Sequence, residues 1–183
     1  MKNSTKHIVR GLAYRVRYFG RKISIGPRTK ISRRSSLKIC GGGSITIGRY
    51  GRIMDYSLLM SYGGDIEIGD DCSINPFCVL YGHGGLKIGD GVRIAAHTVI
   101  IPANHSFADV NIPIWRQAET RSGIIIADDV WIGAGCKILD GVQIGRGCVI
   151  GAGAVVTSSL PDFSIAVGIP ARVVGNRKNP PQT

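Results

Sequence analysis

The feature that most constrains this 183-residue chain is a strict six-residue period in its C-terminal half. From residue 126 onward an aliphatic residue recurs at every sixth position, and four places after each stands a second uncharged residue. The first set is Ile126, Ile132, Ile138, Ile144, Ile150 and Val156, and the second is Val130, Cys136, Val142, Cys148, Ala154 and Leu160. An amphipathic helix would space apolar residues by three and four, and a simple strand by two, so neither explains the pattern.

The same register continues toward the N-terminus with interruptions. Its members are Ile88, Ile94 and Ile100; Ile68, Ile74 and Leu80; Ile47, Ile53 and Leu59; and a weaker set of Ile25, Ile31 and Leu37. Three hexads make one coil of 18 residues, so the sequence predicts six coils. Extra residues always follow the third hexad, at 43–46, 65–67, 86–87 and about 104–125. Insertions on a solenoid gather at one corner, and function is expected at that corner.

Each hexad is predicted to form one short strand and one turn. The aliphatic side chain points into a triangular coil, the small residue packs near the corner, and stacked coils hydrogen-bond in parallel. Four of the five cysteines, Cys72, Cys78, Cys136 and Cys148, occupy the small position and are predicted to be core residues. Cys40 lies in a glycine-rich turn without an assigned role. An odd number of cysteines and no secretion signal argue against a disulfide framework.

Positive charge is concentrated at one end of the chain. Fourteen of the 23 Lys and Arg residues precede Asp55, the first acidic residue, so residues 1–54 carry +14 and the remainder −3. No helix-turn-helix, zinc-binding or RNA-binding signature accompanies this charge, and nucleic acid is therefore not an expected partner. Anionic lipid or a phosphorylated substrate is favoured instead.

Residues 1–22 are predicted to form a basic amphipathic arm. Ile8, Leu12, Val16 and Phe19 stand at helical spacing with basic residues between them. The arm either lies on an anionic membrane or caps the open first coil. No apolar stretch is long enough for a membrane-spanning helix or the core of a signal peptide. We therefore expect a cytoplasmic protein, peripheral on the inner face of the membrane if the arm binds lipid.

The hexads and three segments, D-D-V-W-I-G-A-G, I-G-A-G-A-V-V-T and V-G-I-P-A-R-V-V, resemble the hexapeptide-repeat acyltransferases over roughly residues 25–175. The similarity is closest to the galactoside, maltose and polysaccharide O-acetyltransferases, through I-I-P-A-N-H-S-F and P-I-W-R-Q. The resemblance implies an all-β, left-handed parallel β-helix of about six coils at residues 23–175, with an active-site loop inserted at about 104–125. The hand comes from the family alone, because right-handed crossovers are the general rule. Residues 176–183 are predicted to be a flexible tail.

The resemblance implies that His105 is the catalytic base. Transfer of an acetyl group from a thioester to an alcohol requires removal of the hydroxyl proton, and neutral imidazole is suited to this. Because the cysteines are expected in the core, direct attack is favoured over a covalent route. Asn75, in I-N-P-F, matches an asparagine that contacts the acceptor hydroxyl in the sugar enzymes, with a turn-forming role as the alternative. His83, one coil before His105, is either a substrate contact or a surface loop residue.

Five positions match the family's coenzyme A site. Trp131 corresponds to a tryptophan that lines the pantetheine channel, although it could serve subunit packing instead. The backbone N–H of Ala134 corresponds to a donor facing the thioester carbonyl. Ala152, Thr157 and Arg172 match positions near the tail of the coenzyme.

The sequence departs from the family at two places. Ser158 stands where the sugar enzymes have Lys or Arg, which leaves one phosphate contact open; Arg146, Arg177 or Lys178 could replace it. Gly82 stands where the galactoside and maltose enzymes have an acidic residue that holds the sugar. A free simple sugar is therefore a less favoured acceptor.

We expect an acetyl-coenzyme A-dependent O-acetyltransferase that acts on a sugar, nucleotide-sugar or lipid-linked glycan in the assembly of capsule, exopolysaccharide or lipopolysaccharide. A homotrimer with its sites between neighbouring solenoids is expected. The alternatives are N-acetylation of an amino sugar nucleotide, acetylation of an antibiotic or of serine, and a non-catalytic or metal-binding trimer. A zinc site is disfavoured because His97 and His105 lie eight residues apart, not five as in the zinc-dependent members of this fold, so no metal is expected.

Overall fold

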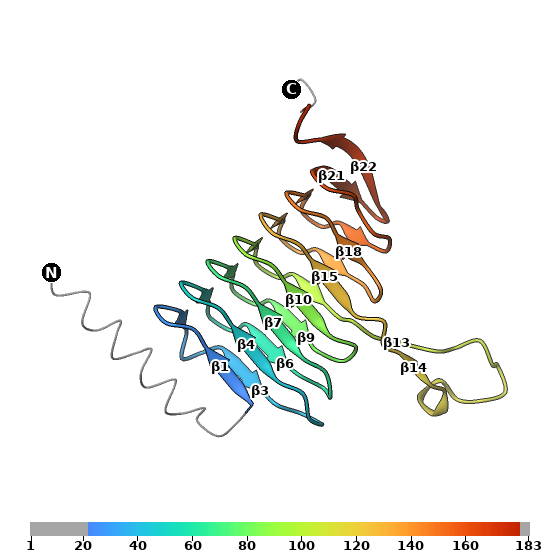
Figure 1. Ribbon diagram of the computed structural model, residues 1–183. Helices are drawn as coiled ribbons and strands as arrows, with labels where there is room; N and C mark the ends of the chain where they lie inside the picture. The colour runs from blue at the N-terminus through green and yellow to red at the C-terminus, as the bar shows by residue number, and fades with distance from the viewer. Residues whose placement is uncertain (1–21, 180–183) are drawn as a thin grey trace, which may run out of the picture.

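The computed structural model describes residues 22–179, and the predicted N-terminal arm therefore lies almost wholly outside the described residues. The chain winds into a column of six coils, each of which contributes one strand to each of three parallel sheets (Figure 1). The predicted all-β solenoid of six coils is confirmed. Within residues 22–179, no helix is long and apolar enough to span a membrane.

The three sheets form the three sides of the column. Sheet A contains β1 (Ile23–Ile25), β4 (Ile45–Ile47), β7 (Ile66–Ile68), β10 (Leu86–Ile88), β15 (Ile124–Ile126) and β18 (Gln143–Ile144). Sheet B contains β2 (Lys30–Ile31), β5 (Arg52–Ile53), β8 (Ser73–Ile74), β11 (Arg93–Ile94), β16 (Trp131–Ile132) and β19 (Val149–Ile150). Sheet C contains β3 (Ser36–Lys38), β6 (Leu58–Met60), β9 (Val79–Tyr81), β12 (Val99–Ile100), β17 (Lys137–Ile138) and β20 (Val155–Val156).

Equivalent residues of successive coils lie directly above one another. Ile88 pairs with Ile68 on one side and Ile126 on the other, so the period of the sequence becomes a continuous column of aliphatic side chains. The aliphatic hexad positions from Ile47 to Val156 are almost fully buried, whereas Ile31 in the weak first coil is only half-buried. Burial of these side chains is the main force that holds the coils together.

Four cysteines fill the small position near the corners, as predicted. Cys72, Cys78, Cys136 and Cys148 are buried, and each thiol lies within hydrogen-bonding distance of a backbone carbonyl of the next coil. Burial raises the pKa of all four thiols, and that of Cys72 reaches about 11. These groups are therefore packing residues and not nucleophiles.

The extra residues lie at the corner between sheets C and A, as predicted. The long insertion leaves the solenoid after β12 and forms a hairpin of β13 (Asn104–His105) and β14 (Glu119–Thr120), with a short 3-10 helix η1 (Ile114–Arg116) near its tip (Figure 1). It ends at Gly123, because Ile124 is buried and pairs with Leu86. The next coil thus begins slightly earlier than the hexads suggest.

The C-terminal end of the column carries an antiparallel hairpin that the six-residue period does not predict. Strand β21 (Ser164–Gly168) pairs in parallel with β19 and in antiparallel fashion with β22 (Ala171–Asn176), which lies at the edge of sheet B. Arg177 follows β22 and donates hydrogen bonds to Asp129 and to the Gly147 carbonyl. The chain therefore still contacts the solenoid at the start of the predicted tail.

Candidate active site

The inserted hairpin places His105 beside a carboxylate. His105 on β13 is the register partner of Glu119 on β14, and its Nε2 atom lies 3.8 Å from Glu119 Oε1. Arg121 donates from Nε and Nη2 to the other carboxylate oxygen, at 3.2 and 2.9 Å. The Arg121 guanidinium, together with the positive charge that His105 can carry, lowers the pKa of Glu119. Glu119 is therefore ionised at neutral pH and faces an imidazole that is 59% exposed.

The base of the hairpin is fastened to the solenoid by one carboxylate of the next coil. Asp140 Oδ1 accepts hydrogen bonds from the backbone N–H groups of Ser122 and Gly123, at 2.9 and 3.0 Å. Its Oδ2 atom accepts one from the Thr120 hydroxyl at 3.1 Å. Because a carboxylate accepts these bonds strongly, the strand that carries Glu119 is fixed relative to the coils.

His83 lies at the same corner, packed among aromatic rings. Tyr62 stacks on its imidazole at 4.9 Å between ring centroids, and Tyr81 lies tilted at 5.7 Å. The His83 Nδ1 atom is buried, and it has no hydrogen-bond partner within residues 22–179. Burial lowers the pKa of His83, and the nearby charge of Arg121 lowers it further. The imidazole is thus neutral at neutral pH, and its Nδ1 atom is enclosed by the surrounding side chains.

The other predicted residues lie elsewhere in the same chain. Ala134 and Ala152 are exposed and occupy successive coils at the corner between sheets B and C, where Asn75 also lies two coils before Ala134. The Asn75 side chain donates to the Ile94 carbonyl at 2.9 Å, so in one chain it has the turn-supporting role. Within the described residues, no acceptor takes the Ala134 backbone N–H. That group is available to a developing oxyanion.

Three predicted coenzyme residues are exposed on different sides of the column. Trp131 points outward from sheet B and is 56% exposed. Arg172 lies on β22, which extends the same sheet. Thr157 follows β20, at the corner that carries the hairpin in an earlier coil. Sheet C therefore separates His83, His105 and Thr157 from Asn75, Ala134 and Ala152 within one chain.

Glu119 and Arg121 are site residues that the sequence reasoning missed. Both lie inside the insertion, where the hexad period is absent and no pattern says which residues face each other. The pairing of Asn104 with Thr120 and of His105 with Glu119 decides this, and it appears only in the folded hairpin. An acidic residue close to the family's P-I-W-R-Q segment was the one available signal.

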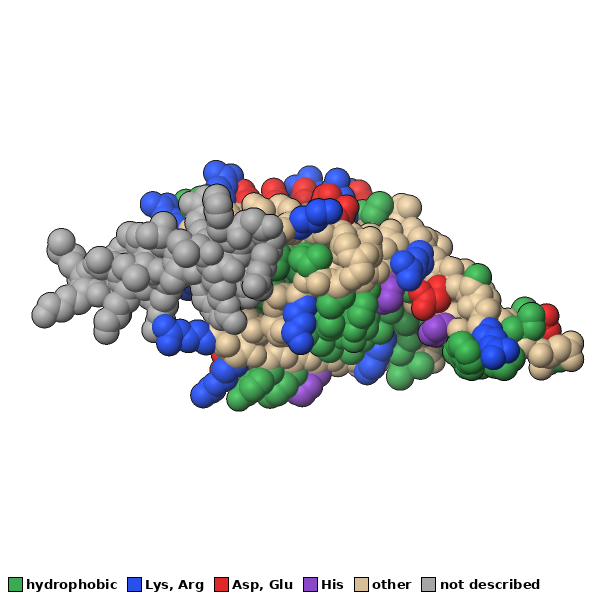
Figure 2. All heavy atoms as spheres, turned by 90° about the horizontal axis from the view of Figure 1, so that it is seen from below, with side chains coloured by type: hydrophobic (Ala, Val, Ile, Leu, Met, Phe, Trp, Pro, Cys, Tyr) green, Lys and Arg blue, Asp and Glu red, His purple; other side chains and the backbone are tan. Residues whose placement is uncertain are grey.

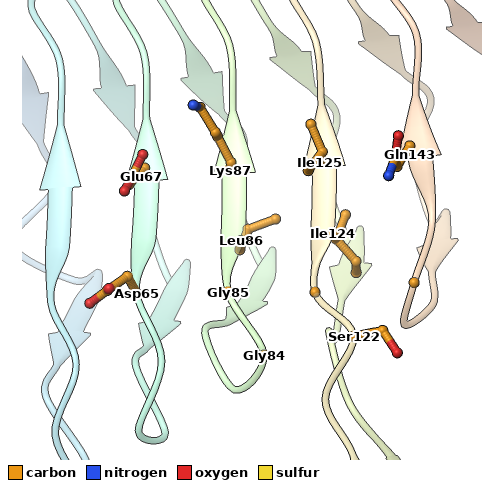
Figure 3. A pocket seen from close by; sticks show the side chains of 12 residues that line it. Asp65, Glu67, Gly84, Gly85, Leu86, Lys87, Ser122, Ile124, Ile125 and Gln143 are labelled. Carbon is orange, nitrogen blue, oxygen red and sulfur yellow. The ribbon is translucent and has the colours of Figure 1, made fainter.

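A shallow hollow lies next to this corner without including the histidines. Figure 3 shows it on the outer face of sheet A, where Glu67, Lys87, Ile125 and Gln143 stand on neighbouring strands. Gly84, Gly85 and Ser122 form its edge toward the hairpin, and its charged side chains are of both signs. It contains no set of converging catalytic groups. Within residues 22–179, no cluster of three His, Cys, Asp or Glu side chains is placed to hold a metal ion.

Comparison with known proteins identifies the family. The description "Bacterial transferase hexapeptide (six repeats)" matches residues 123–158. A variant of AntD, an N-acyltransferase from Bacillus cereus solved with dTDP-4-amino-4,6-dideoxyglucose and coenzyme A, superposes with a TM-score of 0.78 and 30% identity, over 91% of this chain and 90% of that one. This chain belongs to the hexapeptide-repeat acyltransferases. The predicted left-handed parallel β-helix is thereby confirmed.

Two curated relatives are longer than the region they share with this hexapeptide-repeat acyltransferase. "Probable acetyltransferase Rv3034c" of Mycobacterium tuberculosis is 38% identical over 134 residues, which are 73% of this chain and 45% of that protein. The galactoside O-acetyltransferase of Escherichia coli strain K12 is 36% identical over 115 residues, which are 62% of this chain and 55% of that protein. The chain thus spans about half the length of these two relatives.

Proposed function

We propose that this protein transfers the acetyl group of acetyl-coenzyme A to a sugar hydroxyl during assembly of a surface polysaccharide, with His105 as the general base. The observation that carries the proposal is the pairing of His105 with the ionised Glu119 on a fixed hairpin. One imidazole nitrogen faces the carboxylate, and the other is left to accept the hydroxyl proton. Since an alcohol is a weak nucleophile, a base at this point accelerates attack.

The reaction balances without a covalent enzyme intermediate. The hydroxyl oxygen attacks the thioester carbonyl carbon as its proton moves to His105, and the resulting oxyanion accepts a hydrogen bond from the Ala134 N–H. The C–S bond then breaks, and the proton on the imidazolium passes to the coenzyme thiolate. Glu119 stabilises the imidazolium between these two steps, because opposite charges at this separation attract. Trp131, Ala152, Thr157 and Arg172 are proposed to hold the coenzyme.

The site is proposed to form between copies of the chain in a homotrimer. His105 and Ala134 lie at different corners of one column, so a second copy is needed to bring both groups to one acetyl group. The tip of the insertion supports this, because Phe107, Val110 and Trp115 are exposed by 75, 92 and 73%. The Gln117 amide donates to the Asp109 and Ile112 carbonyls, at 2.8 and 2.7 Å, and holds the tip in this shape. Such apolar exposure is typical of a surface that packs on another protein.

A broad apolar face supports the same arrangement. Sheet C presents Leu58, Met60, Val79, Tyr81 and Val99 on its outer side, all partly exposed. Figure 2 shows hydrophobic side chains gathered on the face seen from below, with histidine side chains near its margins and more hydrophobic side chains on the projecting insertion. We propose that the insertion of a neighbouring copy packs along this face. His105 of that copy would then stand near Asn75 and Ala134.

A second acceptor class, the amine of an amino sugar nucleotide, has specific support. The superposition on AntD covers 90% of that protein's chain. The AntD complex contains an amino sugar nucleotide together with coenzyme A. The galactoside O-acetyltransferase supports the hydroxyl instead, over a shorter region. A neutral amine needs less help from a base than a hydroxyl does, and the His105–Glu119 pair therefore favours the hydroxyl.

The test offers acetyl-coenzyme A with a panel of sugars, nucleotide-sugars and amino sugar nucleotides, and follows release of the coenzyme thiol. The products are weighed by mass spectrometry before and after mild alkali, which cleaves an ester and leaves an amide. Loss of the added acetyl mass in alkali supports O-acetylation. Retention of that mass identifies N-acetylation, and thiol release with no acceptor modified would reject both. Glycans of cells with and without the protein identify the natural acceptor.

A further inference from the structure

The corner between sheets B and C holds the same unusual backbone conformation in five successive coils. Tyr56, Phe77, His97, Gly135 and Gly153 all have positive φ angles, of 60, 63, 62, 72 and 73°. Glycine adopts this conformation freely, whereas side chains with a Cβ are strained in it. The last two coils use glycine, as the turn geometry favours, and the three before them use rings.

These three rings form one stack along the outside of the column. The centroids of Tyr56 and Phe77 lie 5.1 Å apart with planes 10° from parallel, and those of Phe77 and His97 lie 4.9 Å apart at 6°. Arg34 covers the far end, with its guanidinium carbon 5.8 Å from the Tyr56 centroid. We call Tyr56, Phe77 and His97 the aromatic ladder. Its side chains are exposed, by 53% for Tyr56 and 49% for Phe77, so they add nothing to the interior.

Beyond His97, the next two coils have no side chain at the position that the rings of the ladder occupy. One face of the His97 imidazole rests on Phe77, and in the next coil the equivalent residue is Gly135, where an added methyl group would meet no atom within 4 Å. Gly153, one coil further, is equally open. Coils of a parallel solenoid repeat about every 4.8 Å, which is also the separation of stacked rings. The space beyond His97 therefore has room for at least one stacked ring, and the exposed Ala134 borders it.

We propose that the open face of His97 is the platform on which a pyranose ring of the acceptor lies. This inference rests on the proposed function for the position of the acetyl group at Ala134. Sugar C–H groups carry partial positive charge and favour the negative face of an aromatic ring. A pyranose stacked on His97 has its substituents at the level of Gly135 and Ala134, next to the acyl carbon. The stacked rings and the open space beside His97, and not the backbone conformation that other turns share, carry this assignment.

The test uses the full chain and variants that keep the backbone geometry. His97→Gly reproduces the residue found in the next coil and removes only the ring, whereas His97→Phe keeps a ring without the nitrogens. Tyr50→Gly is the matched control: Tyr50 also has a φ of 60° and is 48% exposed, but it lies at the corner between sheets A and B. The probes are methyl pyranosides, the matching nucleotide-sugars, dTDP alone and acetyl-coenzyme A. Saturation-transfer NMR and titration measure binding, and steady-state kinetics measure KM.

We expect His97→Gly to weaken pyranoside binding, or raise the acceptor KM, at least tenfold, with binding of acetyl-coenzyme A unchanged within twofold. His97→Phe should retain pyranoside binding within about threefold of wild type, and Tyr50→Gly should match wild type. Wild-type binding by His97→Gly would overturn the proposal. An equal loss of dTDP binding would also overturn it, because the base and not the sugar would then be the stacked ring.

The outcomes separate this inference from the proposed function. Pyranoside binding that depends on His97 without any acetyl transfer would support the sugar site on His97 and refute the transferase proposal. Sugar acetylation by His97→Gly with an unchanged acceptor KM would support the transferase proposal and refute the sugar site on His97. If wild type binds no pyranoside, free or nucleotide-linked, the ladder is not an acceptor site.

Discussion

His105 reaches its position through backbone pairing and not through packing of its side chain. The imidazole is mostly exposed, and Glu119, its register partner, is held by Arg121. Arg121 keeps the pKa of Glu119 below its usual range. The carboxylate is therefore ionised throughout the pH range in which a neutral imidazole can act as base. Strand pairing thus sets the position of His105, and Arg121 sets the charge of Glu119. The two contributions can be tested by separate substitutions.

Replacing His105 by Ala is expected to lower turnover by about a hundredfold or more, the usual size of a general-base contribution. The melting temperature and acetyl-coenzyme A binding should stay near wild type, because the side chain is exposed. Glu119→Gln should lower kcat severalfold with little change in KM, since it removes a charge that acts on the imidazolium. Steady-state kinetics with the identified acceptor measure both. Full turnover by His105→Ala would move the role of base to another residue, with His83 the first to examine.

The cysteines give a second prediction at the residue scale. Burial raises the pKa of Cys72 to about 11, so at pH 8 only about one such thiol in a thousand is ionised, and the thiol is also inaccessible. The native protein should therefore react with a thiol reagent at Cys40 alone, which is partly exposed. The other four cysteines should react only after unfolding. Mass spectrometry of the labelled protein counts the sites, and rapid native labelling of Cys136 would contradict this packing.

At the scale of elements, the base of the insertion is held by hydrogen bonds and its tip is apolar and exposed. Its base is joined to the solenoid by Asp140, whereas its tip presents apolar side chains that are exposed among residues 22–179. A solenoid tolerates such an insertion because each coil contacts only its neighbours. Binding or assembly can therefore change at this element without change in the core.

The double substitution Ile114→Ser and Trp115→Ser should weaken assembly and leave the fold intact. Both residues are exposed on η1, by 56 and 73%, so their loss removes little packing among residues 22–179. Light scattering should give about three times 19.5 kDa for wild type and a smaller mass for the variant at the same concentration. The circular dichroism spectrum and melting temperature of the folded chain serve as controls. A trimer unaffected by the change would place the interface elsewhere, and a monomeric active wild type would remove the proposed shared site.

Across the whole molecule, the charge is as uneven in the fold as in the sequence. The first coils carry Lys30, Arg33 and Arg52 on their surface, and within residues 22–179 none of these makes an ion pair. Arg34 and Arg49 are partly offset by Asp55 and Asp70 of the following coils. The basic first coils thus continue the charge of the N-terminal arm. A membrane role for this end remains a proposal that can be measured.

We expect the full chain to sediment with vesicles that contain anionic lipid, and a form lacking residues 1–22 to bind them less. Seven basic residues precede Ile23, and each contributes about 1 kcal/mol near such a surface. Binding should fall with salt, because the attraction decays over about 10 Å at 0.1 M ionic strength. Neutral vesicles are the control. Equal binding by both forms, together with a loss of stability on deletion, would favour the arm as a cap on the first coil.

The six-residue period was sufficient to predict the coils, the buried column, the inward cysteines and the corner that holds the insertions. The reason is physical: each coil repeats one local geometry, and a residue at a given hexad position meets the same residue type above and below. Ile94 is buried between Ile74 and Ile132 for the same reason that Ile132 is buried between Ile94 and Ile150. In such a fold, the hexad position of a residue therefore predicts most of its tertiary contacts. The role of His105, in contrast, came from likeness to a family.

The tertiary structure decided what the period does not reach. Glu119 faces His105 because a hairpin closes over the thirteen residues between them, and that register depends on pairing and on the anchor at Asp140. His97 stacks on Phe77 because successive turns repeat the same left-handed conformation, which no single hexad reveals. The hairpin of β21 and β22 likewise depends on the pairing of β21 with β19, which lies beyond the reach of the six-residue period. Sequence alone determined the repeating column, and the contacts made at its corners and end required the folded chain.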